Sequence, residues 1–224
     1  MSLDKDINLL YELGTLRHVA RTWRQFGGGS FANVAEHSFR VAWLSMIIAI
    51  HERADVGRTV QMALIHDLPE TRIGDSNYLT RMYMSHNEDD ALMHATAGTC
   101  LQQDAGALWR EYKDRLTLEA KIVKDADNLD CDLELVEETA RGNRIGETLE
   151  PTRKAVYQKL YTSTAKRMFE SIQQSDSHAW HIQGRNRLTA GDWQMKVPPL
   201  QRELKLEQPA DIKNYSQPDD VEES

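Results

Sequence analysis

The stretch ALIHDLPET, residues 63–71, decides the fold that we predict for this chain. Its apolar beginning is typical of a buried helix, yet it leads into His66, Asp67 and then Pro69. Burial of a carboxylate is costly unless the group is paired or binds a metal. Pro69 removes a backbone donor and clashes with the preceding turn, so we expect a kink or a break there. The stretch therefore predicts a helical core that carries either a buried hydrogen-bonded pair or a metal site.

Apolar residues recur at helical spacing along most of the chain, and almost no segment alternates as a strand would. Asn33 followed by Glu36 has the form of a capping box at a helix start. Asp55 can cap the next helix, and Gly74 suits a helix end. Further helices are expected over residues 7–19, from residue 87, over 115–140, and from Pro151 to Ile172. We therefore predict an all-α fold with a core of about six helices.

The helical pattern is confined to the first three quarters of the chain. Within it, residues 24–32, RQFGGGSFA, are expected to form a flexible loop. The periodicity fades after Ser175, so we expect a domain over residues 1–175 and an extension over 176–224. From Lys196 on, proline and charged residues leave little to bury, which predicts a disordered tail.

The composition of the 224-residue chain excludes some classes of partner. The formal net charge is −8, which disfavours binding to a nucleic-acid polymer or an anionic membrane. The ten apolar residues 41–50 are too few to span a bilayer. Cys100 and Cys131 have no metal-type spacing and fall in helical apolar patterns, which predicts buried free thiols and a reducing, cytoplasmic location.

His37 shares a helix face with Val41, Leu44 and Ile48, so its ring is expected to point inward. One interpretation is a core histidine bonded to a carbonyl group; the other is a metal ligand. The pair His66-Asp67 favours the second, because both side chains can bind one cation that lies against the helix.

A further carboxylate is expected from residues 121–138, where four aspartates compete: Asp125, Asp127, Asp130 and Asp132. We favour Asp127, because Val123 and Cys131 lie one turn to either side of it on the apolar stripe. Asp125 and Asp132 have more mixed neighbours and suit a solvated acidic face. His37, His66, Asp67 and Asp127 together offer two nitrogen and two oxygen ligands, a set that suits Mn, Fe, Co, Ni or Zn and leaves room for water.

These residues resemble the motifs of a known family. VAEHS (34–38), HD (66–67) and KDAD (124–127) are similar to the H…HD…D pattern of the HD-domain phosphohydrolases. Arg21-Thr22-Trp23 and HDLPETRIGD (66–75) resemble the 5′-deoxynucleotidase branch, in which a glutamate and then a Gly-Asp pair follow the HD motif. Two features depart from that pattern: the run Gly27-Gly28-Gly29 before the first histidine, and Pro69.

The resemblance implies a helical fold with one divalent metal, often a homodimer, and hydrolysis of (deoxy)nucleoside 5′-monophosphates. It implies that Glu70 orients a water or takes its proton, and that Asp75 protonates the leaving alkoxide, although the two roles can be exchanged. Arg21 would bind the phosphate with its planar fork. Trp23 would pack against the sugar or base and so favour deoxynucleotides.

Three alternatives remain open. Hydrolysis of nucleoside triphosphates or of (p)ppGpp is one, although HD-type (p)ppGpp hydrolases resemble HDxxED, whereas Thr71 follows Glu70 here. An HD-fold oxygenase would need additional histidine ligands at a second metal. A non-catalytic module stabilised by a metal would not need Glu70 and Asp75.

Overall fold

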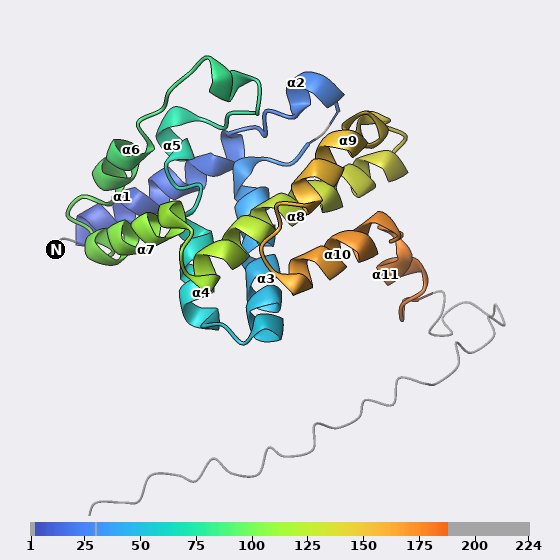
Figure 1. Ribbon diagram of the computed structural model, residues 1–224. Coiled ribbons are helices and arrows are strands. Elements are labelled where there is room, and N and C mark those ends of the chain that lie inside the picture. The colour runs from blue at the N-terminus through green and yellow to red at the C-terminus, as the bar shows by residue number, and fades with distance from the viewer. Residues whose placement is uncertain (1–2, 30, 188–224) are drawn as a thin grey trace, which may run out of the picture. The chain divides into compact units, whose positions relative to one another are not determined.

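A computed structural model describes residues 3–29 and 31–187, and within these ranges every regular element is a helix (Figure 1). The predicted all-α fold is thereby confirmed. One isolated bridge joins Ala20 to Asn33. The elements are α1 (Leu3–Gly14), η1 (Thr15–His18), α2 (Arg24–Gly27), α3 (Val34–Glu52), α4 (Val56–Ile65), α5 (Glu70–Ile73), η2 (Thr80–Met82), α6 (Glu88–Thr96), α7 (Gln102–Asp114), α8 (Leu118–Ala140), α9 (Ile145–Tyr157), α10 (Ser163–Gln173) and α11 (Ala179–Ile182).

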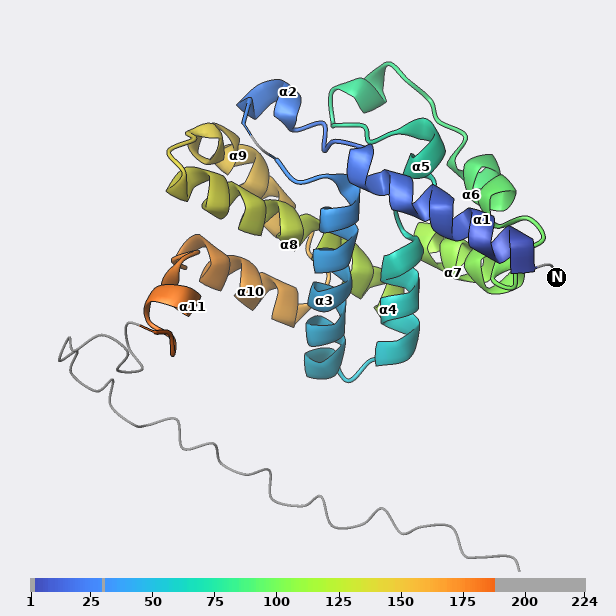
Figure 2. The same cartoon turned by 180° about the vertical axis from the view of Figure 1, so that it is seen from behind.

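Helices α3, α4 and α8 form the centre of the core. Each of the three packs against the other two, and α7 and α10 pack against α8 (Figures 1 and 2). Ile48, Met62, Ile122 and Leu129, which come from these three helices, are fully buried. Because α3 and α8 are the longest helices described, at 19 and 23 residues, polar side chains in their middle turns lie deep in the molecule.

Side-chain caps fix where the central helices begin. Asn33 accepts from the backbone N–H of Glu36, and Glu36 accepts in return from that of Asn33, which confirms the predicted capping box. Asp55 accepts from the backbone N–H of Arg58, as expected for the cap of α4. A cap of this kind contributes about 1 kcal/mol. The first of them sets His37 in the opening turn of α3, facing inward.

Two predicted segments differ from the structure. Residues 24–32 contain the short helix α2. No helix begins at Pro151, which lies inside α9. That helix starts earlier because Ile145 and Leu149 pack on Leu135, and it ends before α10 because Asp125 binds the intervening chain.

Tertiary contacts divide the chain into one unit that ends at Ser177 and a second that starts at His178. The second unit is described only over residues 178–187, which contain α11 and a 3.1 Å contact between His178 Nδ1 and His181 Nε2. The predicted tail from Lys196 lies outside the described residues, and the division at residue 175 stays a prediction.

The structure bears on the apolar run and the two cysteines of the sequence analysis. Every helix in residues 3–29 and 31–187 is too short or too polar to cross a bilayer. Cys131 is buried and free, but the prediction of a buried thiol was wrong for Cys100, which is exposed. The apolar pattern around Cys100 does not continue into a helix, because the chain turns there between α6 and α7. The cytoplasmic location stays a prediction.

Candidate metal centre

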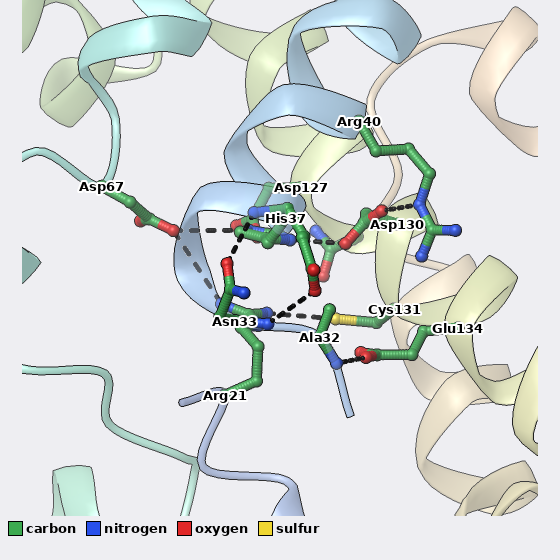
Figure 3. Close-up of polar contacts among 12 residues, drawn as sticks. Arg21, Ala32, Asn33, His37, Arg40, Asp67, Asp127, Asp130, Cys131 and Glu134 are labelled. Carbon is green, nitrogen blue, oxygen red and sulfur yellow. Dashed lines mark hydrogen bonds and ion pairs between the residues drawn. The ribbon is translucent and has the colours of Figure 1, made fainter. Parts of the chain in front are cut away.

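The structure brings the four predicted metal ligands together where α3, the end of α4 and α8 meet. His37, His66 and Asp127 each offer one ligand atom, and these atoms lie within 4.8 Å of one another. Asp67 Oδ2 lies 3.3 Å from His37 Nε2 and 3.2 Å from His66 Nε2. Asp127 Oδ1 lies 3.3 Å from His37 Nε2 (Figure 3).

A break between α4 and α5 places two adjacent residues at one point. Helix α4 ends at Ile65 with His66 as its C-cap, and α5 begins only at Glu70, after Pro69. In an unbroken helix, neighbouring side chains would diverge by about 100°. The turn of residues 66–69 instead directs His66 and Asp67 to the same centre. The break expected from Pro69 is present and begins three residues before it.

Four buried atoms at this centre have no hydrogen-bond partner among the described residues. They are His37 Nε2, His66 Nε2, Asp67 Oδ2 and Glu70 Oε2. Buried polar atoms nearly always have a partner, so such a group of unsatisfied donors and acceptors needs an explanation. A divalent cation bound by nitrogen and carboxylate oxygen explains the first three directly. The residues present therefore fit a metal.

The second nitrogen of each histidine is already engaged, which turns Nε2 toward the centre. His66 Nδ1 lies 2.6 Å from the carbonyl oxygen of Ala63. His37 Nδ1 lies 2.5 Å from Asp130 Oδ2. Arg40 donates to the other oxygen of Asp130 and, at 2.6 Å, to Glu137. This arrangement fixes the tautomer in which Nε2 is free to bind a metal.

The role of Asp130 was missed at the level of sequence, where it was only a competitor for ligand. A signal was available: Asp130 lies three residues after Asp127 and so shares its helix face. Its carboxylate reaches the far nitrogen of the same histidine ring.

The solvent exposure predicted for Asp125 and Asp132 was wrong. Asp125 and Asp132 are fully buried, not solvated. Asp125 accepts 2.8 Å bonds from the backbone of Tyr161 and Thr162, and Asp132 binds Arg153 at 2.7 Å and 2.8 Å. Distant segments supply these partners, so the local pattern could not reveal them. Of the four competing aspartates, Asp127, whose side chain is 18% exposed, is the one whose carboxylate groups with both histidines.

The carboxylates of the centre are held in different protonation states. Burial raises the pKa of Asp67, but His66 and His37 outweigh it and hold the pKa well below its usual range. Burial also raises the pKa of Asp127, but Lys124 and His37 outweigh this effect and hold the pKa well below its usual range. Burial, together with repulsion from Asp67 and Asp75, raises the pKa of Glu70 to about 10. This raised pKa belongs to the metal-free protein; the charge of a bound cation would lower it, so that Glu70 could then accept a proton.

Arg21 and Asp75 lie on one side of the centre. Arg21 is buried, and its Nη1 lies 3.9 Å from Asp67 Oδ2 and 3.7 Å from Asp75 Oδ1. Asp75 accepts from the backbone N–H and the hydroxyl of Thr22, at 2.6 Å and 2.8 Å. The side chain of Asp75 is only 5% exposed. It anchors the segment that carries Arg21.

Trp23 belongs to an aromatic group. Its ring centroid lies 5.8 Å from that of Tyr78, which stacks on Phe26 at 5.4 Å. Trp23 also packs on the small apolar cluster formed by Leu135, Ile145 and Leu149. Among the described residues, no hydrogen bond, ion pair or ring contact joins Trp23 to the predicted ligands, so its place beside the sugar stays a prediction.

A cavity of about 240 Å³ opens beside the ligands and is lined by His66, Asp67 and Glu70. Four cationic side chains contribute to its wall: Arg81, Lys113, Arg115 and Lys124. Glu88, which pairs with Lys113, and the rings of Trp109 and Tyr112 also line it. Lys124 Nζ lies 2.7 Å from Asp127 Oδ2. The guanidinium of Arg115 lies 3.5 Å from the centre of the Tyr112 ring, and its Nη1 is buried with no hydrogen-bond partner in the described part of the chain. In a chain of net charge −8, this wall is suited to an anion.

Comparison with known proteins places the chain in a family. A family model described as HD domain matches residues 13–173. The 5′-deoxynucleotidase HDDC2 of Danio rerio is 28% identical over 134 residues, which cover 57% of this chain and 66% of that protein. The 5′-deoxynucleotidase HDDC2 of Dictyostelium discoideum is 30% identical, with 55% and 72% covered. The structure of a conserved hypothetical protein from Pyrococcus furiosus, 28% identical, superposes with a TM-score of 0.61 over 75% of this chain and 99% of that one.

Proposed function

Since this chain belongs to the HD-domain family, we propose that it is a metal-dependent phosphomonoesterase that hydrolyses (deoxy)nucleoside 5′-monophosphates to nucleoside and phosphate. Its predicted relationship to the HD-domain phosphohydrolases is confirmed. The substrate class is supported by the names of the curated relatives, which are 5′-deoxynucleotidases. The match spans about two thirds of the length of the Danio rerio protein, at 66%.

One observation carries the proposal: a set of unsatisfied metal-ligand atoms adjoins a cavity with a cationic wall. His66 and Asp67 belong to both features. A cation at the ligands and an anion against the wall would be neighbours. This is the arrangement that hydrolysis of a phosphate ester requires.

His37, His66, Asp67 and Asp127 would hold one divalent cation, for which Mn, Co, Fe, Ni and Zn all suit the donor set. When bound, such an ion supplies a coordinated water of lowered pKa and withdraws charge from the phosphoryl oxygens. Glu70 lines the same cavity and has an unpartnered Oε2, so it can orient the attacking water or take its proton.

Two arginine side chains can hold the phosphate of the substrate in place. Arg21 offers a planar fork on the side of Asp67, and Arg115 offers an unpartnered nitrogen in the cavity wall. Asp75, beside Arg21, is the candidate donor of a proton to the leaving alkoxide, and its role can be exchanged with that of Glu70. Trp23 beside the sugar would penalise a 2′-hydroxyl, so deoxynucleotides are the proposed preference.

The four cationic side chains in the cavity wall support a second candidate function, the hydrolysis of nucleoside triphosphates. Arg81, Lys113, Arg115 and Lys124 could together hold more than one phosphate group. The two reactions release different products, because a phosphomonoesterase liberates inorganic phosphate from dAMP, and a triphosphohydrolase liberates nothing from it.

A screen of nucleotides against divalent metals tests the proposal. Paired dAMP and AMP, with dATP beside them, would be incubated with the protein and each metal in turn, and phosphate and nucleoside would be measured. We expect phosphate from dAMP with at least one metal and a lower kcat/KM for AMP. Release from dATP alone would select the second candidate, and no release from any nucleotide with any metal would refute both.

A further inference from the structure

Two segments of the chain lie side by side next to the candidate metal centre, one starting at Arg21 and the other at Asp75. Thr22 donates to Asp75 from its backbone N–H and from its hydroxyl, at 2.6 Å and 2.8 Å. The side chain of Asn77 donates to that of Gln25 at 3.0 Å. These bonds hold the two segments against each other, so the aromatic residues that they carry come together.

Three rings meet there: Trp23 and Phe26 from the first segment and Tyr78 from the second. The ring centroid of Tyr78 lies 5.4 Å from that of Phe26, with 26° between the planes, and 5.8 Å from that of Trp23. Trp23 and Phe26 are partly buried, because they pack on the small apolar cluster around Leu149. Tyr78 stacks on Phe26 with one face and is 53% exposed, so it is the ring of the three that can present a free face to a ligand.

The backbone on which Tyr78 stands is held in place from both sides. Asn77 is buried, and its side-chain oxygen accepts from the backbone N–H groups two and three residues further along, at 3.0 Å each. A 2.8 Å contact between Ser76 Oγ and His86 Nε2 joins the two ends of this loop. A ring that is already held in this way loses little freedom when a ligand stacks on it, which favours binding.

Tyr78 lies between two parts of the proposed site. On one side, its neighbour Trp23 follows Arg21 by two residues, and Arg21 Nη1 lies 3.9 Å from Asp67 Oδ2. On the other side, Arg81 comes three residues after Tyr78 and lines the cavity beside the ligands. A nucleotide whose phosphate lies at the metal centre could therefore place its base against an exposed aromatic ring.

We propose that Tyr78 determines specificity by stacking on the nucleobase of the substrate. The inference rests on the proposed nucleotidase function and deepens it, because it assigns a residue to the part of the substrate that does not react. Every base has a π-face, so a stacking contact with an aromatic ring is strong but does not select one base. We therefore expect the protein to accept several bases and to discriminate against a sugar phosphate that has none.

Binding of deoxyadenosine, the nucleoside that dAMP would yield, tests the stacking without any turnover. Isothermal titration calorimetry would compare the native protein with Tyr78→Ala and Tyr78→Phe. We expect Tyr78→Ala to weaken binding about 10-fold, whereas Tyr78→Phe, which keeps the ring, should bind as the native protein does. Tyr83→Ala is the matched control, because Tyr83 lies in the same loop outside the aromatic group and is 80% exposed, so binding should be unchanged. Circular dichroism would establish that the variants fold.

Hydrolysis then separates this inference from the proposed function. Deoxyribose 5-phosphate has the sugar and the phosphate of dAMP but no base, so Tyr78→Ala should raise KM about 10-fold for dAMP and leave it unchanged for the sugar phosphate. An equal change in KM for both substrates would overturn the role of Tyr78. So would native protein that fails to bind deoxyadenosine, or binding that survives in Tyr78→Ala. Loss of deoxyadenosine binding in Tyr78→Ala, without phosphate release from dAMP by the native protein, would support the base contact and refute the proposed function.

Discussion

The ring of His37 shows how much of the centre depends on a single supporting residue. Asp130 holds Nδ1, and Nε2 is thereby left for the metal. Partners of this kind typically change metal affinity by about 10-fold to 100-fold. The carboxylate of Asp130 is itself held by Arg40, so its position is fixed before any metal arrives.

We predict that Asp130→Asn weakens metal binding by about 10-fold to 100-fold while the protein stays folded, because the amide keeps the shape but loses the charge that orients the ring. Competition with a metal-binding dye would measure the affinity. Glu137→Gln is the control: Glu137 contacts Arg40 but not His37, so its affinity should match that of the native protein. Equal affinity in Asp130→Asn would contradict the supporting role.

Substitutions of Asp127 and Asp125 should have different effects, one on metal binding and the other on the stability of the fold. We predict that Asp127→Ala loses the metal, since its carboxylate lies beside both histidines. Asp125→Ala should keep the metal but lose about 1–3 kcal/mol of unfolding free energy, because it removes the acceptor of the N–H groups of Tyr161 and Thr162, of which the bond to Thr162 is buried. Metal analysis and urea unfolding would report the two effects, and a reversal between the variants would move the ligand to Asp125.

The site residues differ in how far the sequence revealed them. His37, His66 and Asp67 could be found because polar groups on apolar helix faces need compensation. The burial of Asp125 and Asp132 could not, since their partners Tyr161, Thr162 and Arg153 come from segments far along the chain.

Among the elements, the break between α4 and α5 has the clearest functional consequence. The turn of residues 66–69 presents His66 and Asp67, and Gly74 then ends α5 one residue before Asp75. Gly74 has φ 73° and ψ 168°, a conformation that is essentially restricted to glycine. The position of Asp75, and through it that of Arg21, therefore depends on this glycine.

We predict that Gly74→Ala destabilises the protein by about 1–3 kcal/mol through backbone strain, although an added Cβ would meet no atom within 4 Å. Gly14→Ala is the matched control. Its Cβ would also meet open space, and its φ of −60° is ordinary for alanine. Urea unfolding would compare the two, and an equal free energy in both variants would show that the strain at Gly74 is unimportant.

The helix starts that carry a side-chain cap were predicted correctly, whereas the start and the end of α9 were not. Capping residues such as Asn33 and Asp55 bond to backbone groups within four residues, so a short sequence pattern is enough to predict them. The division between α9 and α10 depends on Asp125 in α8, which no local pattern contains.

At the scale of the whole molecule, the metal would join three helices that are distant in sequence. The candidate ligands come from α3, the end of α4 and α8, the same helices that form the core. The fold class could be predicted from periodicity alone. The cationic wall could not, because Arg81 and Lys124 lie apart in sequence from the neighbouring pair Lys113 and Arg115, and only the fold brings them together.

We therefore predict that a chelator lowers the melting temperature of the native protein. At a free metal concentration of about 100 times Kd, binding stabilises the folded state by about 3 kcal/mol. His66→Ala, which lacks a ligand, should melt at one temperature with or without chelator. Calorimetry would make the comparison, and an unchanged melting temperature for the native protein would argue against a metal in the core.

The central claim is that a metal bound at these ligands serves phosphate-ester hydrolysis, with Glu70 in the chemistry and not in metal retention. The most direct test measures metal content and phosphate release from dAMP on the same samples of native protein and Glu70→Gln. The account predicts equal metal content and a kcat reduced by about 10²-fold or more in the variant. Equal turnover in both proteins, or loss of the metal together with the activity, would contradict it.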